Sequence, residues 1–314
     1  MIAENDVVLA VDIGGTKTAV ALADRDDVLL RVESAPTPAA LGPAAVVATV
    51  IGLARRLLPS GARPLAGVGI GTAGVVDVST GTIVSATDTF ADWPGTPLAD
   101  EVRRALGALV DAHAPVVVQN DVDAHAAGEF RHGAAAGASS ALIVAVGTGV
   151  GAGVMLGGEA VRGAHHVAGE IAHMPTPGAE HLRCPCGRRG HLEAVGSGIG
   201  MHRHFLHLGG DPAVRDARGV AAAAETGDPL ARRALADSAS AVGRALAGAA
   251  TLIDPERIVI TGGVPNIGDA WWEPMRRAFA ADAIDRLQST PILPGVLGDE
   301  APLRGAAASA WRAR

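Results

Sequence analysis

Lysine is almost missing from this 314-residue sequence, because Lys17 is the only lysine among 26 basic residues. Tyrosine is absent, and the large aromatic residues are limited to four Trp and four Phe. So few rings disfavour the stacking platforms that bind single-stranded nucleic acids. A formal net charge of -7 also disfavours non-specific binding to a phosphate backbone. We therefore expect no nucleic-acid partner.

Cysteine is equally scarce, and long apolar runs are missing. The two cysteines, Cys184 and Cys186, are separated by one residue, which excludes a disulfide framework and favours a metal site. No apolar run is long enough to span a bilayer, and Met1–Asp6 shows no basic segment ahead of an apolar stretch. We therefore expect a cytoplasmic protein with no membrane partner.

Apolar residues are plentiful, at 48% of the chain, and they alternate between two periodicities. Short apolar runs typical of buried strands are followed by helical spacing, which predicts an α/β protein. The order strand, glycine-rich turn, strand occurs near Asp12 and again near Gly147. This repetition suggests two related halves, and the cleft between them is the natural ligand site.

Three segments are predicted in more detail because they flank the motifs. The spacing predicts an amphipathic helix over Pro97–His113 and helical structure over Glu193–Leu208. The glycines from Gly147 to Gly153 are predicted to form one long turn, with a strand following over Val154–Leu156.

The segment Asp12-Ile13-Gly14-Gly15-Thr16-Lys17 has the composition of a phosphate-binding turn. Paired glycines let the backbone approach a ligand, and successive amide N–H groups can form an anion-binding concavity. Thr16 adds a hydroxyl donor and Lys17 a cation. An ordinary hairpin turn explains Gly-Gly equally well, but the lone lysine favours phosphate.

Two later glycine clusters offer bare backbone in the same way. The run Gly147-Thr148-Gly149-Val150-Gly151 follows a predicted strand, and Gly262-Gly263 follows another. The first run superficially resembles a dinucleotide fingerprint. That interpretation is rejected, because a strand follows the run where the fingerprint requires a helix. A simple loop remains an alternative for Gly262-Gly263.

The pair Asn120-Asp121 lies at the end of a predicted strand, just before a predicted helix. A carboxylate at such a place can accept the proton of a substrate hydroxyl. Aspartate is also a favoured helix N-cap, so a purely structural role is the alternative for Asp121.

Two cysteines and two histidines in one loop favour a metal ion. His173, Cys184, Cys186 and His191 can supply four ligands, and such a set suits tetrahedral zinc. Other histidines of the same region compete for the role, namely His165, His166 and His181.

Together these motifs resemble those of the ROK proteins (repressors, open reading frames and sugar kinases) of the actin–hexokinase superfamily. The similarity runs from the Asp12–Lys17 motif to Leu303-Arg304-Gly305-Ala306-Ala307. Its most specific part is Leu142 to Glu193, which resembles the family signature followed by a Cys-x-Cys-Gly-x-x-Gly-Cys-x-Glu zinc motif.

The resemblance implies an α/β fold of two ribonuclease-H-like domains, of the actin/hexokinase type, that close over ATP and a sugar in an interdomain cleft. We place the first domain at residues 1–118, joined by a C-terminal helix over 300–314. The second domain is placed at 119–299 and carries the zinc loop 165–193.

The resemblance also implies a role for each candidate residue, with Mg²⁺ accompanying ATP. Asp121 corresponds to the general base that activates the sugar hydroxyl. The remaining sugar contacts correspond to Asn120, Glu170, His173 and Glu193. The zinc ligands correspond to His173, Cys184, Cys186 and His191. The nucleotide contacts correspond to Asp12, Gly14, Gly15, Thr16, Lys17, Gly147, Thr148, Gly149, Gly151, Gly262 and Gly263.

The sequence departs from the family pattern at four positions. His191 stands where the family usually has a third cysteine, so we expect a Cys2His2 zinc site. Ala172 replaces a glycine, and Asp88 and Asp123 each replace an asparagine. These changes bear on which sugar is bound more than on the chemistry.

The activity implied by the resemblance is phosphorylation of a hexose at its 6-hydroxyl, with glucose as the first substrate. An N-acetylmannosamine or N-acetylglucosamine kinase is the alternative. A ROK repressor is disfavoured, because Asp12 lies too near the start for a preceding helix-turn-helix segment. A catalytically silent sugar-binding protein is the third possibility. Family members are commonly homodimers or homotetramers.

Overall fold

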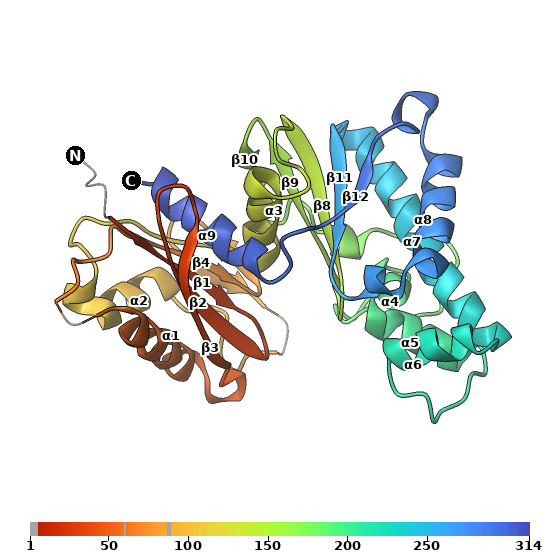
Figure 1. The fold of residues 1–314 in the computed structure, drawn as a ribbon. Helices are drawn as coiled ribbons and strands as arrows, with labels where there is room; N and C mark the ends of the chain where they lie inside the picture. The colour runs from red at the N-terminus through yellow and green to blue at the C-terminus, as the bar shows by residue number, and fades with distance from the viewer. Residues whose placement is uncertain (1–5, 60, 87–88) are drawn as a thin grey trace. The chain divides into compact units, whose positions relative to one another are not determined.

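The computed structural model describes residues 6–59, 61–86 and 89–314, so Asp88 lies outside the described residues. The chain divides into two compact units, each built of a sheet and helices (Figure 1). The first unit contains the residues up to 137 together with 159–168 and 297–314. The second contains 138–158 and 169–296.

The division differs from the predicted boundary after residue 118. Helix α3 (Asp121–His132) belongs to the first unit because it packs against the C-terminal helix α9 (Glu300–Arg312). The Leu297 amide also donates a hydrogen bond of 2.9 Å to the Glu129 carboxylate of α3. Packing between segments so distant in sequence leaves no local signal at residue 118.

The sheet of the first unit has the strand order β3-β2-β1-β4-β7. The first three strands in the chain form antiparallel pairs, whereas β1, β4 and β7 are parallel. The carboxyl ends of the parallel strands therefore meet at one edge. The strands are β1 (Val8–Ile13), β2 (Lys17–Ala23), β3 (Leu29–Pro36), β4 (Gly67–Thr72) and β7 (Val116–Asn120).

Helices pack against both faces of this sheet. Side chains of a strand alternate between its faces, so neighbouring residues of β1 join different cores. Leu9 and Val11 of β1 join the core formed with α1 (Pro43–Leu57) and α2 (Leu98–Leu106). Val8 and Ala10 join a smaller, alanine-rich core with α9. The remaining elements are β5 (Val75–Asp77), β6 (Thr82–Ser85) and the 3-10 turns Ala39–Leu41 and Gly107–Leu109. Strand β10 (Glu159–Ala160) is the edge strand of the other sheet.

The second unit repeats this hairpin-and-parallel arrangement. Its strands β8 (Ser140–Val146) and β9 (Val150–Leu156) are antiparallel, and β11 (Arg257–Thr261) lies parallel to β8. Strand β12 (Ile292–Pro294) continues the sheet beyond β11. The order β9-β8-β11 thus corresponds to β2-β1-β4, which agrees with the repetition seen in the sequence.

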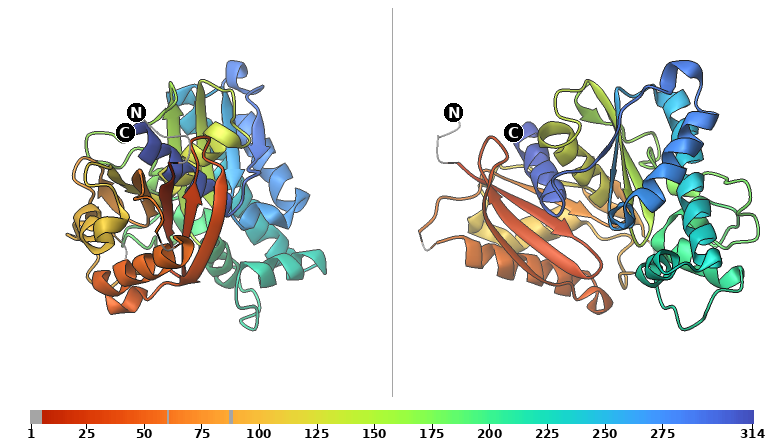
Figure 2. Two further views of the ribbon diagram at one scale, coloured as in Figure 1. Left: turned by 60° about the vertical axis from the view of Figure 1, so that its left-hand side comes forward. Right: turned by 45° about the vertical axis from the view of Figure 1, so that its right-hand side comes forward.

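Long helices accompany the second sheet, as the two views in Figure 2 make clear. The longest, α7 (Pro229–Ile253), packs against α8 (Asp269–Asp282). The other helices of the second unit are α4 (Glu193–Gly196), α5 (Gly198–His207), α6 (Ala217–Glu225) and the 3-10 turns Ile171–His173, Val264–Ile267 and Asp285–Leu287.

Among the described residues, none of the helices has both the length and the apolar character that a membrane span requires.

Three segment predictions were wrong in detail. Helix α2 ends at Leu106, because Gly107 takes a positive φ of 54° and terminates it. The predicted helix over Glu193–Leu208 is two helices, separated by the extended residue Ser197, whose side chain caps α5. The second glycine turn is short, since β9 already begins at Val150, and Gly151 lies in the strand opposite Ala145.

Candidate active site and metal centre

Two aspartates of the first unit lie at the edge where the parallel strands end. Asp12 is the penultimate residue of β1, level with Gly71 of β4. Asn120 ends β7 opposite Thr72, and Asp121 begins α3 directly afterwards. Both aspartates are half-buried. The fold thus gathers two carboxyl groups that are 109 positions apart in the sequence.

Burial changes the acidity of both groups. It raises the pKa of Asp12 to about 7, and the negative charge of Asp121 adds to this shift, while Lys17 opposes it. Burial also raises the pKa of Asp121, although the Val122 amide, which donates to its carboxylate at 2.9 Å, acts in the opposite direction. A carboxylate with a raised pKa is a better proton acceptor than an exposed one.

Asn120, and not Asp121, is the N-cap of α3. Its side-chain oxygen accepts hydrogen bonds from the Val122 and Asp123 amides at 2.9 and 3.4 Å. Its side-chain nitrogen donates to the Gly74 carbonyl at 3.0 Å. The N-cap alternative considered for Asp121 is therefore wrong, because the preceding residue performs that function.

The first glycine turn joins β1 to β2 and is closed by a bond of 3.0 Å from the Gly14 amide to the Lys17 carbonyl. Gly15 is half-buried at this turn, and Thr16 and Lys17 are exposed. The Lys17 ammonium donates to the Asp299 carboxylate at 2.6 Å, just before α9 begins. This ion pair lowers the pKa of Asp299. Asp299 was not predicted as a site residue, because no local pattern connects residues 282 positions apart.

The second glycine turn joins β8 to β9 and is tied to Glu193. The Gly147 amide donates to the Gly149 carbonyl at 2.9 Å, and the Val150 amide donates to the Glu193 carboxylate at 3.0 Å. A Cβ at Gly149 would lie 2.9 Å from that carboxylate. Glycine at 149 therefore leaves room for the Glu193 carboxylate beside the turn, and Thr148 is exposed.

A cavity of about 790 Å³ lies beside this turn in the second unit. Gly147, Thr148 and Gly263 contribute to its wall, and α6 supplies Arg218 and Glu225. Gly262 has a positive φ of 98°, and a Cβ there would lie 2.4 Å from the Val146 carbonyl oxygen, so only glycine fits this turn. Helix α6 was not predicted, although Asp216 as N-cap and the alanine run that follows it are its sequence signals.

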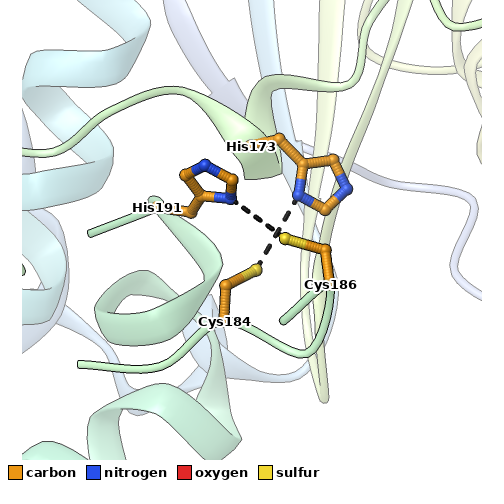
Figure 3. Close-up of side chains that lie close together, drawn as sticks. All are labelled: His173, Cys184, Cys186 and His191. Carbon is orange, nitrogen blue, oxygen red and sulfur yellow. Dashed lines mark hydrogen bonds between the residues drawn. The ribbon is translucent and has the colours of Figure 1, made fainter. Parts of the chain in front are cut away.

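The four predicted zinc ligands converge within the second unit. In Figure 3 the side chains of His173, Cys184, Cys186 and His191 point toward one another. One ligand atom from each lies within 4.8 Å of all the others. His173 Nδ1 is 3.8 Å from Cys184 Sγ, and His191 Nδ1 is 3.2 Å from Cys186 Sγ. Both cysteines are free of disulfides.

These residues fit a zinc ion on geometric and chemical grounds. Tetrahedral bonds of about 2.0–2.3 Å place neighbouring ligand atoms roughly 3.3–3.8 Å apart, which is close to the two distances given, within a group whose atoms lie up to 4.8 Å apart. The other ring nitrogen of His173, Nε2, lies 3.5 Å from the Glu170 carboxylate, an arrangement typical of metal-bound histidines. Burial raises the pKa of the Cys184 thiol to about 11, so its thiolate needs a cation nearby.

The competing histidines lie outside this group. His166 Nε2 is 3.8 Å from Asp77, and the ring of His181 lies against His207 with centroids 4.3 Å apart. His165 is exposed, and among the described residues it is not part of the converging set. Ala172 is buried in the turn before His173 and lacks a positive φ, so the methyl group that departs from the family pattern is accommodated.

The predicted site residues divide between the two units. Asp12, the first turn, Asn120 and Asp121 belong to the first unit. The second turn, the cavity, Glu170, His173, Glu193 and the Cys/His group belong to the second. Glu170 is exposed, and Glu193 is half-buried at the start of α4.

Comparison with known proteins identifies the class. The sequence profile of the ROK family matches residues 8–313, and the chain belongs to the ROK family. It is 31% identical to a glucokinase of Streptomyces coelicolor over 319 aligned positions, which cover 95% of this chain and 96% of that protein. The fold is accordingly that of the two-domain ROK sugar kinases.

Solved structures agree with this assignment. A ROK hexokinase from Thermus thermophilus has a TM-score of 0.84 at 31% identity, covering 98% of each chain. A ROK family glucokinase from Streptomyces griseus, solved in complex with glucose and AMPPNP, has a TM-score of 0.78 at 30% identity, covering 98% of this chain and 99% of the other.

Relatives with other substrates in their names are similar as well. A bifunctional NanE/NanK enzyme of Brucella melitensis is 35% identical over 96% of this chain and 53% of its own length. A kanosamine kinase of Amycolatopsis mediterranei is 31% identical over 96% of this chain and 95% of its own.

Proposed function

We propose that this protein is an ATP-dependent sugar kinase that transfers the γ-phosphoryl group of ATP to the 6-hydroxyl of a hexose. The proposed substrate is glucose, and the products are glucose 6-phosphate and ADP. The observation that carries the proposal is the half-buried Asp121, whose pKa is raised, at the strand edge that also holds Asp12. Membership of the ROK family and similarity to glucokinases support it.

Asp121 is the proposed general base. A sugar hydroxyl is a weak nucleophile, so the enzyme must hold it in line with the γ-phosphate and accept its proton as the new bond forms. A general base of this kind contributes about 10²–10⁴-fold to the rate. The helix cap formed by Asn120 fixes the backbone from which the Asp121 side chain extends.

Asp12 is the proposed carboxylate for Mg²⁺, which neutralises charge on the phosphate oxygens when bound. Carboxylate oxygens are ligands that Mg²⁺ prefers, and a cation would favour the ionised form that burial now disfavours. Lys17, Thr16 and the amides of Gly14 and Gly15 are proposed to contact phosphate. Lys17 would then exchange Asp299 for the anionic donor.

The second unit is proposed to hold the rest of the donor, and it shares the contacts to the sugar with Asn120 and Asp121 of the first unit. The cavity beside Thr148 and Gly263 is wide enough for a nucleoside, at about 790 Å³. The proposed contacts of the second unit to the phosphates are Gly147, Thr148, Gly149 and Gly151, with Gly262 and Gly263 toward the adenosine. The sugar hydroxyls are proposed to meet Asn120, Glu170, His173 and Glu193.

A structural zinc ion is proposed for His173, Cys184, Cys186 and His191. With four protein ligands the site would have no open position, so its contribution is to hold the loop that carries Glu170 and Glu193. Coordination through His173 Nδ1 would also fix its tautomer and leave Nε2 for a hydrogen bond.

The identity of the sugar is the finer part of the proposal, since glucokinases, a kanosamine kinase and a NanE/NanK enzyme are all similar to this chain. The alternative substrate to glucose is N-acetylmannosamine or N-acetylglucosamine. The cytoplasmic location and the oligomeric state stay predictions.

A panel of sugars tests the proposal. Purified protein with ATP and Mg²⁺ is assayed for ADP release against hexoses and N-acetylhexosamines, and the product is identified by mass. We expect glucose to give the highest kcat/KM. Absence of sugar-dependent ADP release across the whole panel would contradict the kinase assignment. A preference for N-acetylmannosamine would contradict only the choice of sugar.

A further inference from the structure

An arginine outside the predicted site donates hydrogen bonds to residues on both sides of Asp121. Arg162 lies in the segment 159–168, which belongs to the first unit although it is flanked on both sides by the second. Its guanidinium donates through Nη2 to the Gln119 side-chain oxygen at 2.7 Å, and through Nη1 to the Asp123 carboxylate. These two acceptors flank Asn120 and Asp121 in the sequence.

Both partners of Arg162 are themselves fixed. Gln119 is completely buried near the end of β7, and the same side-chain oxygen accepts a bond of 3.2 Å from the Ser309 hydroxyl of α9. Its side-chain nitrogen faces the Gly305 carbonyl at 3.5 Å. Asp123 is buried in the first turn of α3. The Arg162 guanidinium therefore links the end of β7 to the first turn of α3, and its two acceptors lie on either side of Asp121 in the sequence.

Arginine is the side chain suited to this task. Its planar guanidinium presents several N–H groups in a fixed fork, so it can reach two acceptors simultaneously, whereas an ammonium is a point charge. The Arg162 side chain is only 24% exposed and that of Asp123 12% exposed, so water competes weakly for the bonds. Asp123 is also one of the positions where this sequence departs from the asparagine of the family pattern.

We propose that Arg162 is a positioning residue for Asp121, and the inference rests on the proposed kinase function. By bridging Gln119 and Asp123, the guanidinium fixes the strand-to-helix turn and so holds the Asp121 carboxylate where the sugar hydroxyl must be deprotonated. Displacement of a reacting group by about 1 Å can cost on the order of 10²-fold in rate. Arg162 makes no contact with the reacting groups in this account, and its effect passes through Asp121.

The test separates positioning from charge compensation. Arg162→Met alone would remove a cation from beside the buried Asp123 carboxylate, so the double variant Arg162→Met/Asp123→Asn removes both charges together. We expect its melting temperature to stay close to that of the wild type, kcat with glucose to fall about 10–100-fold, and KM for ATP to change less than threefold. Wild-type kcat in the folded double variant would overturn the proposal.

A conservative variant covers the case in which the double variant does not fold. Arg162→Lys keeps the charge beside Asp123 but loses the fork, and we expect kcat to fall about 3–10-fold. If the double variant is unfolded, wild-type kcat in Arg162→Lys overturns the proposal and the expected loss supports it.

The chain offers a matched control in the same segment. Glu159, three residues before Arg162, accepts a bond of 2.6 Å from Arg312 of α9. Arg312→Met/Glu159→Gln removes this second anchor, and its kcat should stay within twofold of the wild type. An equal loss in the control would overturn the proposal, because any loosening of the segment would then suffice. Failure of the wild type to phosphorylate any sugar is a separate result, which overturns the kinase function and this inference together.

Discussion

The two glycine turns occupy equivalent places in the two units, yet a carboxylate holds each of them in a different way. The turn at Gly14 ends in the exposed ammonium of Lys17, which is paired with Asp299 at 2.6 Å. The turn at Gly147 ends in a backbone amide, that of Val150, which donates to Glu193 at 3.0 Å. In the first turn a side chain is restrained, and in the second the backbone itself.

This difference separates two ways of preparing a site for phosphate. An exposed ion pair is weak, because water screens both charges, so Lys17 can leave Asp299 at little cost. A half-buried hydrogen bond from backbone to carboxylate resists change and keeps the amides of the second turn in place. The first turn therefore suits a contact that forms when the donor binds, and the second a preformed cradle.

The largest expected effect comes from breaking the support of the second turn. Cys184→Ser removes a proposed zinc ligand only nine residues before Glu193, so the loop that positions Glu193 and His173 should loosen. We expect the bound zinc to fall from about one per chain to near zero and kcat/KM for the sugar to fall more than about 100-fold. Metal content by mass spectrometry and steady-state kinetics measure both.

The matched control for the zinc loop is His181→Ala, which changes an exposed histidine of the same loop outside the metal group. It should retain its zinc and its activity. Full activity in metal-free Cys184→Ser protein would contradict the supporting role of the metal.

The next effect in size tests the first turn. Lys17→Met removes the only lysine and should lower kcat/KM for ATP about 10–150-fold, the equivalent of losing one charge-assisted contact of roughly 1.5–3 kcal/mol. Asp299→Asn removes only its resting partner, so its effect should stay below about fivefold. Comparable losses in both variants would mean that the ion pair itself, and not the phosphate contact, is what matters.

The smallest effect concerns Asp12 and the pH dependence of stability. Its folded pKa of about 7 lies above the ordinary value of 3.8, so the folded state binds more protons than the unfolded state between these values. Stability contributed by the protonated form is therefore lost as the pH rises toward 7. Asp12→Asn should remove this penalty, which screening limits to about 1–2 kcal/mol.

Thermal melts of Asp12→Asn and the wild type measure this effect. The variant should melt roughly 3–6 °C higher at pH 8, with the difference vanishing near pH 4. A variant that is less stable than the wild type at pH 8 would show that the Asp12 charge is compensated in the folded protein.

Local patterns in the sequence predicted the motif residues, but not the distant residues that contact them. Asp12 was placed near a strand end because the apolar run that contains it stops at Gly14, and Asp121 because a short strand runs into Asn120-Asp121. The Cys and His residues were grouped because they share one short loop and because cysteine occurs nowhere else in the chain. Both patterns are local. Zinc itself, and the role of each site residue, stay predictions.

What the sequence did not predict depends on contacts between distant segments. The pairing of Lys17 with Asp299, the packing of α3 on α9 and the grip of Arg162 on Gln119 and Asp123 each join residues far apart in the chain. The length of the second turn was also wrong, because glycines at 151 and 153 suggest a loop, whereas the pairing of β9 with β8 keeps them in a strand.

The most direct test of the account is Asp121→Asn, measured for both turnover and sugar binding. The substitution keeps the size of the side chain and removes its ability to accept a proton. We predict that ATP-dependent formation of glucose 6-phosphate falls by at least about 10²-fold, while calorimetric binding of glucose stays within a few-fold of the wild type. Normal turnover by this variant would contradict the assignment of Asp121 as the base, and with it the central claim.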